Sequence, residues 1–264
     1  MLGKLLKYEF KYLVRDLART YIIYGAVLLS VILLFQLAGA GNSDGFILSL
    51  FSACATAYVI FTIVLVILTI ARNVRRFKRN MFSQEGYLTN TLPVTPEQHI
   101  VAKAIAGAVS CAVSYLVIFV GLWILFVGLG MGREISSVFS SLVNYIKLSY
   151  FIPAFLSTTT GFLAVLLCLY LAVSISSMIG GSKGKAALLV IGAYIAYTMI
   201  ASLITTSIAD PNIYSYIDSY TDYADAVYRT TALRMYILTM LHTGIAAAEF
   251  FAIVHIIKNK LNLQ

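Results

Sequence analysis

The sequence predicts an all-α integral membrane protein with six transmembrane helices, and three observations support this prediction. Hydrophobic residues make up 60% of the 264-residue chain and charged residues only 11%, whereas soluble domains carry roughly 45–50% apolar and about 25% charged residues. Six apolar stretches are each long enough to cross a bilayer, which takes about 20 residues. Basic residues gather between alternate stretches. This composition argues against a soluble enzyme, a disordered tail and a nucleic-acid-binding domain.

The six predicted spans are much longer than typical strands and lack the alternating pattern of a membrane β-barrel. They cover residues 21–41, 46–71, 100–128, 153–179, 186–209 and 231–256. We therefore expect two parts, an N-terminal helix over residues 1–20 and a six-helix transmembrane domain over residues 21–264.

The distribution of lysine and arginine predicts which side of the membrane each connection faces. The chain has 19 of these residues, and four lie in segments that an inside N-terminus would place outside: Arg133, Lys147, Arg229 and Arg234. The other fifteen lie in the segments placed inside. Because cytoplasmic connections carry the excess of basic residues, both termini are predicted to be cytoplasmic. The net charge of +8 then follows from topology and anionic lipid, and no nucleic-acid partner is expected.

The N-terminal segment is predicted to be an amphipathic helix in the inner interface of the membrane. Basic residues recur every three or four positions, and leucines fall on another face: Lys4, Lys7, Lys11 and Arg15 against Leu2, Leu6, Leu13 and Leu17. Such a helix buries its apolar side at the acyl boundary and directs its basic side toward lipid phosphates. It is interpreted as a membrane anchor, and the same surface is also compatible with contact to a cytoplasmic partner.

The connection over residues 72–99 is the longest cytoplasmic one and ends in a helix-start pattern. Thr95 is a candidate N-cap, Pro96 is suited to the first helical position, and Gln98 follows three residues after the cap. The pattern predicts a helix that leads directly into the third span. A capped span start with solvated charges would explain these residues without any further role.

Two other features favour neither a nucleotide site nor a metal site. The loop 180–185 is rich in glycine and lysine, but Ile179 and Ala186 stand where a Walker motif needs glycine and serine or threonine. The three cysteines lie inside predicted spans, at spacings that fit neither zinc nor a disulfide framework. No cofactor is therefore expected on this chain.

Charged and polar residues inside a span are candidate functional residues because hydrocarbon disfavours them. The sixth span contains His242 and Glu249, seven residues apart and therefore on one face. Glu249 is expected either to pair with a basic group or to take part in a proton or substrate site.

A second acidic feature lies in the outer connection before the sixth span. Asp218, Asp222 and Asp225 follow a helical spacing beside a stripe of tyrosines. This favours a helix at the headgroup level. A surface that receives a cationic substrate or Ca²⁺ is the alternative interpretation.

Taken with the architecture, the stretch from Glu85 to Thr95 and the following Lys103 resemble the membrane subunit of an ABC-2-type transporter. The resemblance lies in the basic N-terminal helix, six spans, both ends inside, and a first cytoplasmic loop longer than the second. It implies a bacterial cytoplasmic-membrane half-transporter that works as a dimer with itself or a sister permease. The outer connection before the last span is shorter than in exporters of lipid or polysaccharide.

The resemblance also implies a partner and a coupling region. ATP and Mg²⁺ would bind to a separate cytoplasmic ATPase subunit, and this chain would not be an enzyme. The residues expected to couple the two subunits are Glu85, Gly86, Pro93, Thr95, Pro96, Glu97, Gln98 and His99. The implied substrate is an amphipathic peptide, a bacteriocin or a hydrophobic drug, and a cationic peptide would suit the acidic outer face.

Two other classes of protein are compatible with parts of the sequence, and a third is not. A proton-coupled secondary carrier would use His242 and Glu249, although the inverted repeats or broken helices of such carriers are not evident. A membrane immunity or sensor protein would have the same composition and no ATPase. An intramembrane metalloprotease would need clustered metal ligands, which three histidines without a His-Glu-x-x-His motif do not supply.

Overall fold

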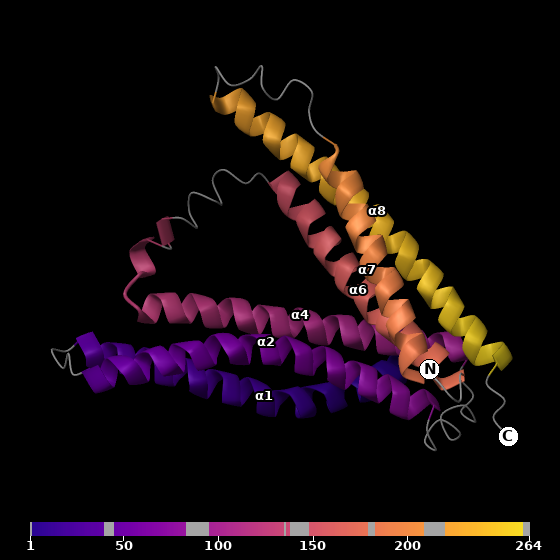
Figure 1. The fold of residues 1–264 in the computed structure, drawn as a ribbon, viewed down its shortest axis with the longest axis horizontal. Coiled ribbons are helices and arrows are strands. Elements are labelled where there is room, and N and C mark those ends of the chain that lie inside the picture. Colours follow the sequence, from indigo (N-terminus) through magenta and orange to yellow (C-terminus); the bar gives the residue numbers. More distant parts are fainter. Residues whose placement is uncertain are drawn as a thin grey trace. The chain divides into compact units, whose positions relative to one another are not determined.

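The computed structural model describes residues 2–39, 45–82, 95–134, 136–137, 148–178, 183–208 and 220–260. These residues form six long helices (Figure 1), namely α1 (Leu2–Gly39), α2 (Gly45–Phe82), α4 (Pro96–Gly128), α6 (Leu148–Met178), α7 (Lys183–Thr206) and α8 (Tyr220–Lys260). Each is long and apolar enough to cross a membrane. The prediction of a multi-pass, all-helical membrane protein with six spans is confirmed.

The first helix is longer than the span predicted for it. Helix α1 has 38 residues, a length of about 57 Å at 1.5 Å per residue, while the hydrocarbon core of a bilayer is roughly 30 Å thick. The boundary expected near residue 20 lies inside this helix. The segment contains no proline, so nothing in it interrupts the helical hydrogen bonds, and the basic N-terminal turns continue directly into the apolar part.

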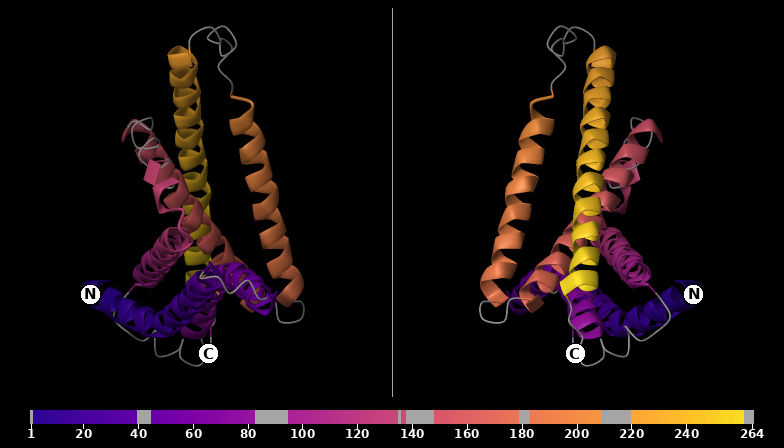
Figure 2. Two further views of the ribbon diagram at one scale, coloured as in Figure 1. Left: turned by 90° about the vertical axis from the view of Figure 1, so that its left-hand side faces the viewer. Right: turned by 90° about the vertical axis from the view of Figure 1, so that its right-hand side faces the viewer.

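Helix α8 is also longer than expected, with 41 residues. Residues 220–229 were expected in a separate outer helix at the headgroup level, but they form the first turns of α8 and continue straight into the span (Figure 2). The sequence from Tyr220 to Thr231 offers no proline or glycine at which the helix could turn.

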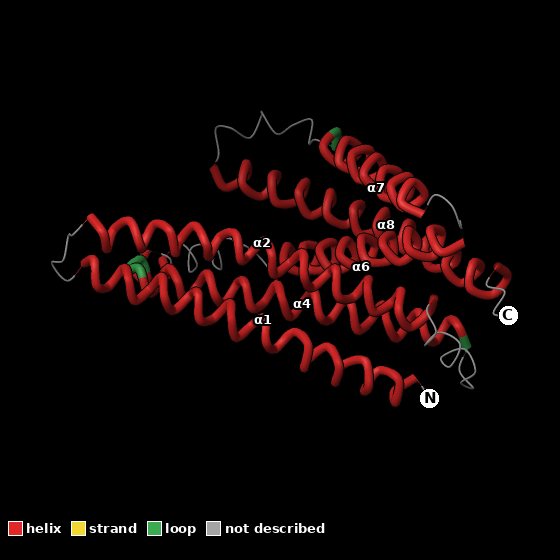
Figure 3. The backbone as a smooth tube through the Cα atoms, turned by 60° about the horizontal axis from the view of Figure 1, so that its bottom comes forward, coloured by secondary structure: helices red, strands yellow, loops and turns green. Residues whose placement is uncertain are grey.

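The chain forms two compact units, and we describe each by itself. Unit 1 comprises residues 1–73 and 105–145, and unit 2 comprises residues 74–104 and 146–264. Every regular element in the described part of both units is a helix (Figure 3). Helices α2 and α4 each contribute one segment to each unit.

The core of unit 1 lies between α1, α2 and α4. Its buried apolar centre contains Tyr24, Leu28, Val31, Tyr58 and Leu65. The Tyr24 and Tyr58 hydroxyls are 2.6 Å apart and share a hydrogen bond. Gly121 of α4 makes room for this pair, since a Cβ at Gly121 would lie 2.8 Å from the Tyr24 ring.

The core of unit 2 is built around α6, which contacts both α7 and α8. Phe77 at the end of α2 is fully buried and stacks on Tyr170 of α6, with ring centroids 4.1 Å apart and planes 6° apart. Ile100 of α4, Leu166 of α6 and Ile253 of α8 complete the same cluster. On α7, large apolar side chains such as Leu189 and Leu203 are exposed, as suits a surface that faces lipid.

Candidate functional sites

Helix α4 begins at Pro96, the residue at which its sequence predicts the helix start. Thr95 precedes the helix, Pro96 is its first residue, and the His99 amide donates to the Thr95 carbonyl at 3.3 Å. The Glu97 carboxylate accepts a hydrogen bond from the Thr95 hydroxyl and forms an ion pair with Lys258 of α8. The first turn of α4 and the last turns of α8 are therefore joined within unit 2.

The residues of this turn differ in accessibility. Glu97 is half-buried and Gln98 is exposed, so both are available to a partner, whereas His99 is only 2% exposed and belongs to the interior of unit 2. The other expected coupling residues, Glu85, Gly86 and Pro93, lie outside the described residues.

The basic residues of α1 lie where the amphipathic pattern places them. Lys7, Lys11 and Arg15 are exposed, and Leu13 and Leu17 are buried on the opposite side. Lys4 lies in the first turn of α1.

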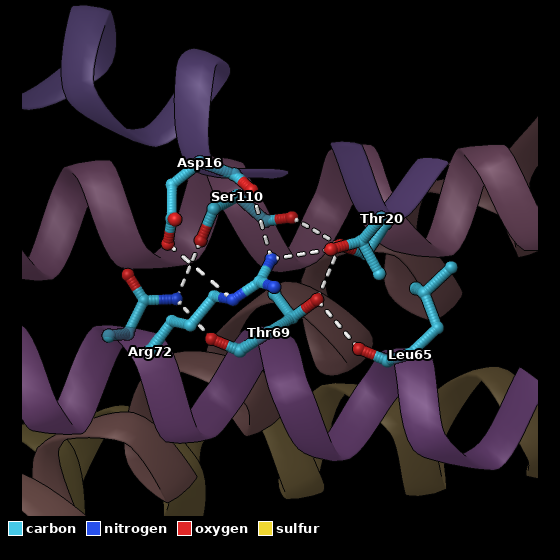
Figure 4. Close-up of polar contacts among 8 residues, drawn as sticks. Asp16, Thr20, Leu65, Thr69, Arg72 and Ser110 are labelled. Carbon is cyan, nitrogen blue, oxygen red and sulfur yellow. Dashed lines mark hydrogen bonds and ion pairs between the residues drawn. The ribbon is translucent and has the colours of Figure 1, made fainter. Parts of the chain in front are cut away.

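A polar network that the sequence analysis did not anticipate crosses the interior of unit 1 (Figure 4). The Arg72 guanidinium of α2 donates from Nη1 to the Thr20 hydroxyl at 2.7 Å and to the Asp16 carbonyl at 3.1 Å, both on α1. Its Nε lies 3.5 Å from Asp16 Oδ2. Arg72 therefore contacts three polar atoms of α1. It was expected among the solvated charges of the cytoplasmic connection that begins at residue 72.

The network continues from α2 to α4. Asn73 donates to the Ser110 hydroxyl at 2.8 Å. One turn further along, the Ser114 hydroxyl lies 2.9 Å from that of Thr69 and 2.8 Å from that of Tyr21. Hydrogen bonds between polar side chains hold transmembrane helices together and fix which faces meet. This network therefore sets the register of the three helices of unit 1.

A signal for this network is present in the sequence. Each of the three helices carries a pair of small polar or charged residues four positions apart, and such pairs lie on one face: Asp16 and Thr20, Thr69 and Asn73, and Ser110 and Ser114. Three matching pairs on three helices indicate that these faces point toward one another.

Glu249 lies on the side of α8 that faces α6 and α7. It is 6% exposed, and its Oε2 atom is buried without a hydrogen-bond partner in the described part of the chain. Cys168 of α6 and Tyr194 and Tyr197 of α7 lie within electrostatic range of the carboxyl group. No basic side chain forms a salt bridge with it among the described residues. Of the two sequence-based expectations, pairing with a basic group therefore has no support in the described residues.

His242 has a different environment from Glu249, seven residues away on α8. It is half-buried and forms a hydrogen bond with the backbone of Ser157 on α6. The ring packs against Gly161, where an added Cβ would lie 3.3 Å from His242 Nδ1. No contact joins His242 and Glu249 among those described.

The acidic residues of the outer connection are only partly within the described chain. Asp222 and Asp225 lie in the first two turns of α8, and Asp218 lies outside the described residues. Further along α8, Arg234 donates from Nε to the Ile208 carbonyl at 2.8 Å, just beyond α7. It therefore satisfies a carbonyl at the end of α7, where cations are favoured.

Searches of protein-family models, curated proteins and solved structures find no match to this chain. In the described residues, no group of three or more His, Cys, Asp or Glu side chains is placed to hold a metal ion. Within the described residues, the start of α4 presents accessible polar groups and the surroundings of Glu249 contain unpaired ones.

Proposed function

We propose that this chain is the membrane-spanning subunit of an ATP-driven exporter of the ABC-2 type. In this proposal it lies in the bacterial cytoplasmic membrane with both termini inside, as a homodimer or paired with a sister permease. A separate ATPase binds on the cytoplasmic side of this chain, and ATP and Mg²⁺ bind to that ATPase. The substrate is an amphipathic or hydrophobic molecule such as a peptide, bacteriocin or drug.

The ion pair between Glu97 and Lys258 is the observation that carries this proposal. Both side chains are more than a third exposed, so the pair contributes little to stability. It nevertheless ties the first turn of α4 to the end of α8, and the exposed Gln98 lies beside it. A partner that binds this turn would therefore contact the ends of α4 and α8 together. Contacts that differ between two states are how a bound subunit shifts a membrane domain.

Purification from native membranes in mild detergent tests the proposal. We expect the tagged chain to recover a soluble protein with a Walker motif. Glu97→Lys and Gln98→Ala should reduce that recovery severalfold, and Glu134→Gln, which changes an exposed carboxylate beyond the other end of α4, should leave it unchanged. Recovery of the chain alone, under conditions that preserve other membrane complexes, would exclude the proposal and favour an immunity or sensor protein.

A proton-coupled carrier is the second candidate, because Glu249 is buried and forms no salt bridge with any of the described residues. The two functions differ in their energy source. Transport in vesicles that persists without ATP and collapses when the proton gradient is dissipated would favour the carrier.

A further inference from the structure

Two unpaired oxygen atoms lie in one part of unit 2, between α6, α7 and α8. Glu249 Oε2 and the Tyr197 hydroxyl oxygen are both buried without a hydrogen-bond partner in the described chain, and the two residues interact electrostatically. Buried polar atoms are normally satisfied, so two orphans in one place call for a ligand or solvent.

The apolar surroundings of Glu249 indicate what kind of partner is missing. Ala246 and Ile253 lie on the same face of α8 as Glu249 and are buried. A carboxylate in such surroundings is costly unless a cation accompanies it. The nearest lysine along α8, Lys258, lies nine residues away and pairs with Glu97. Among the described residues, no basic side chain forms a salt bridge with Glu249.

The tyrosines favour an organic cation over a metal ion. The Tyr194 and Tyr197 rings lie 5.9 Å apart at 44°, and aromatic faces attract ammonium groups. An ammonium group also has N–H donors, which are the partners that both orphaned oxygens lack. A metal ion would need more ligands than the single carboxylate supplies, and no cluster of three ligands is found in the described residues.

We propose that Glu249, Tyr194 and Tyr197 bind the protonated amine of a cationic amphipathic molecule, with its hydrocarbon part in the apolar interior of unit 2. This proposal rests on the proposed export function and names the class of substrate. The Glu249 carboxylate supplies the negative charge and accepts one N–H of the ammonium group. The Tyr197 hydroxyl accepts a second N–H, and the faces of the two tyrosine rings contact the cation.

Calorimetric titration of the purified chain in nanodiscs tests the site, with lipid-only nanodiscs titrated to subtract partitioning. The probes are n-hexylammonium, n-hexyltrimethylammonium, which keeps the charge without N–H donors, and n-hexanol, which is neutral. We expect saturable binding of n-hexylammonium, weaker binding of the trimethyl compound and none of the alcohol. Glu249→Gln should weaken n-hexylammonium binding at least tenfold, because charge-assisted hydrogen bonds are the strong ones.

Tyr197→Phe keeps the ring and removes only the hydroxyl, so it tests the site with little risk to folding. It should weaken n-hexylammonium binding about threefold to tenfold, an effect of the size of one hydrogen bond, and should leave the trimethyl compound unaffected. Tyr236→Phe, which changes an exposed tyrosine of α8, is the matched control and should bind as the wild type does.

Three results would overturn the proposal: equal binding by Glu249→Gln in a protein that elutes and melts like the wild type, equal binding of n-hexanol, or proton uptake at Glu249 with no amine binding. The titration uses the chain without any ATPase. Its failure would therefore leave the purification result intact, and recovery of the chain alone would leave an observed amine site intact.

Discussion

Arg72 donates a 2.7 Å hydrogen bond to the hydroxyl of Thr20, which lies 52 residues earlier in the chain. The two ends of this contact lie on different helices, and Thr20 is only 5% exposed. The ion pair of the same guanidinium with Asp16 is more accessible, since the Asp16 side chain is 41% exposed. The buried hydrogen bond is therefore expected to contribute more to stability than the ion pair.

Thr20→Val and Asp16→Asn separate these two contributions. Thr20→Val keeps the side-chain shape and should lower the free energy of unfolding by about 1–2 kcal/mol, because it removes a buried hydrogen bond to a charged donor. Asp16→Asn should lower it by less than about 1 kcal/mol, as is usual for exposed ion pairs. Unfolding by sodium dodecyl sulfate in mixed micelles measures both, and a larger effect of Asp16→Asn would contradict this ranking.

Gly121→Ala should destabilise unit 1. The added Cβ would lie 2.8 Å from the buried Tyr24 ring and 3.1 Å from the Tyr58 hydroxyl, so the hydrogen-bonded tyrosines must move, at a cost of about 1–3 kcal/mol. Gly192→Ala is the control, because nothing lies within 4 Å of that position and alanine favours helix. Thermal melting in detergent should show a lower midpoint for Gly121→Ala alone.

The stacked pair of Phe77 and Tyr170 predicts a strong contrast between two variants. Phe77→Ala removes a fully buried ring and should cost about 3–5 kcal/mol. Tyr170→Phe keeps the stacked ring and loses the marginal hydrogen bond of 3.5 Å to the Lys103 carbonyl, so it should cost much less, about 1 kcal/mol. If the two variants lose equal free energy of unfolding in a denaturant titration, the Tyr170 hydroxyl matters as much as the buried Phe77 ring, and this prediction is wrong.

A double-mutant cycle measures the pair of Glu97 and Lys258. Glu97→Gln, Lys258→Gln and the double variant should reveal a coupling energy below about 1 kcal/mol, since both groups are well exposed. If the proposed coupling role is correct, the same variants should reduce recovery of the ATPase by much more than this stability effect explains. A coupling energy of several kcal/mol would instead assign the pair a structural role.

The proposed orientation can be tested by chemical labelling of single cysteines. In a background with Cys54, Cys111 and Cys168 replaced, Lys7→Cys and Glu134→Cys should lie on opposite sides of the membrane, since both positions are exposed. An impermeant maleimide applied to intact cells should label only Glu134→Cys. Labelling of Lys7→Cys before the membrane is opened would contradict the inside location of the N-terminus.

The number of spans could be predicted from the sequence because the length of an apolar run is a direct requirement of the bilayer. The start of α4 could be predicted as well, since Thr95 and Pro96 act through local backbone chemistry. Helical structure at the start of α1 and of α8 was predicted, but its continuity with the spans was missed, as was the extension of α2 to Phe82. Helices continue past the hydrocarbon wherever proline and glycine do not stop them. The basic residues from Arg72 to Arg79 are one example, as all of them lie within α2.

The candidate sites were harder to predict from the sequence. The contact of Arg72 with Thr20 depends on which helix faces meet, and a single helix does not determine this. Glu249 was recognisable as a charge within an apolar run, but its neighbours on α6 and α7 come from distant parts of the chain. Hydropathy therefore indicates that a polar residue is unusual, and only packing indicates what it faces.

The two charged contacts of α8 determine the bilayer that suits this chain best. Arg234 is held at the end of α7, and Lys258 is held by Glu97. Twenty-four residues separate them, about 36 Å along the helix axis. Moving either charge into hydrocarbon is costly, so a mismatch in membrane thickness is met by tilt or by deformation of the lipid. Lipid composition alone would then alter the tilt of α8, whose last turns meet the first turn of α4.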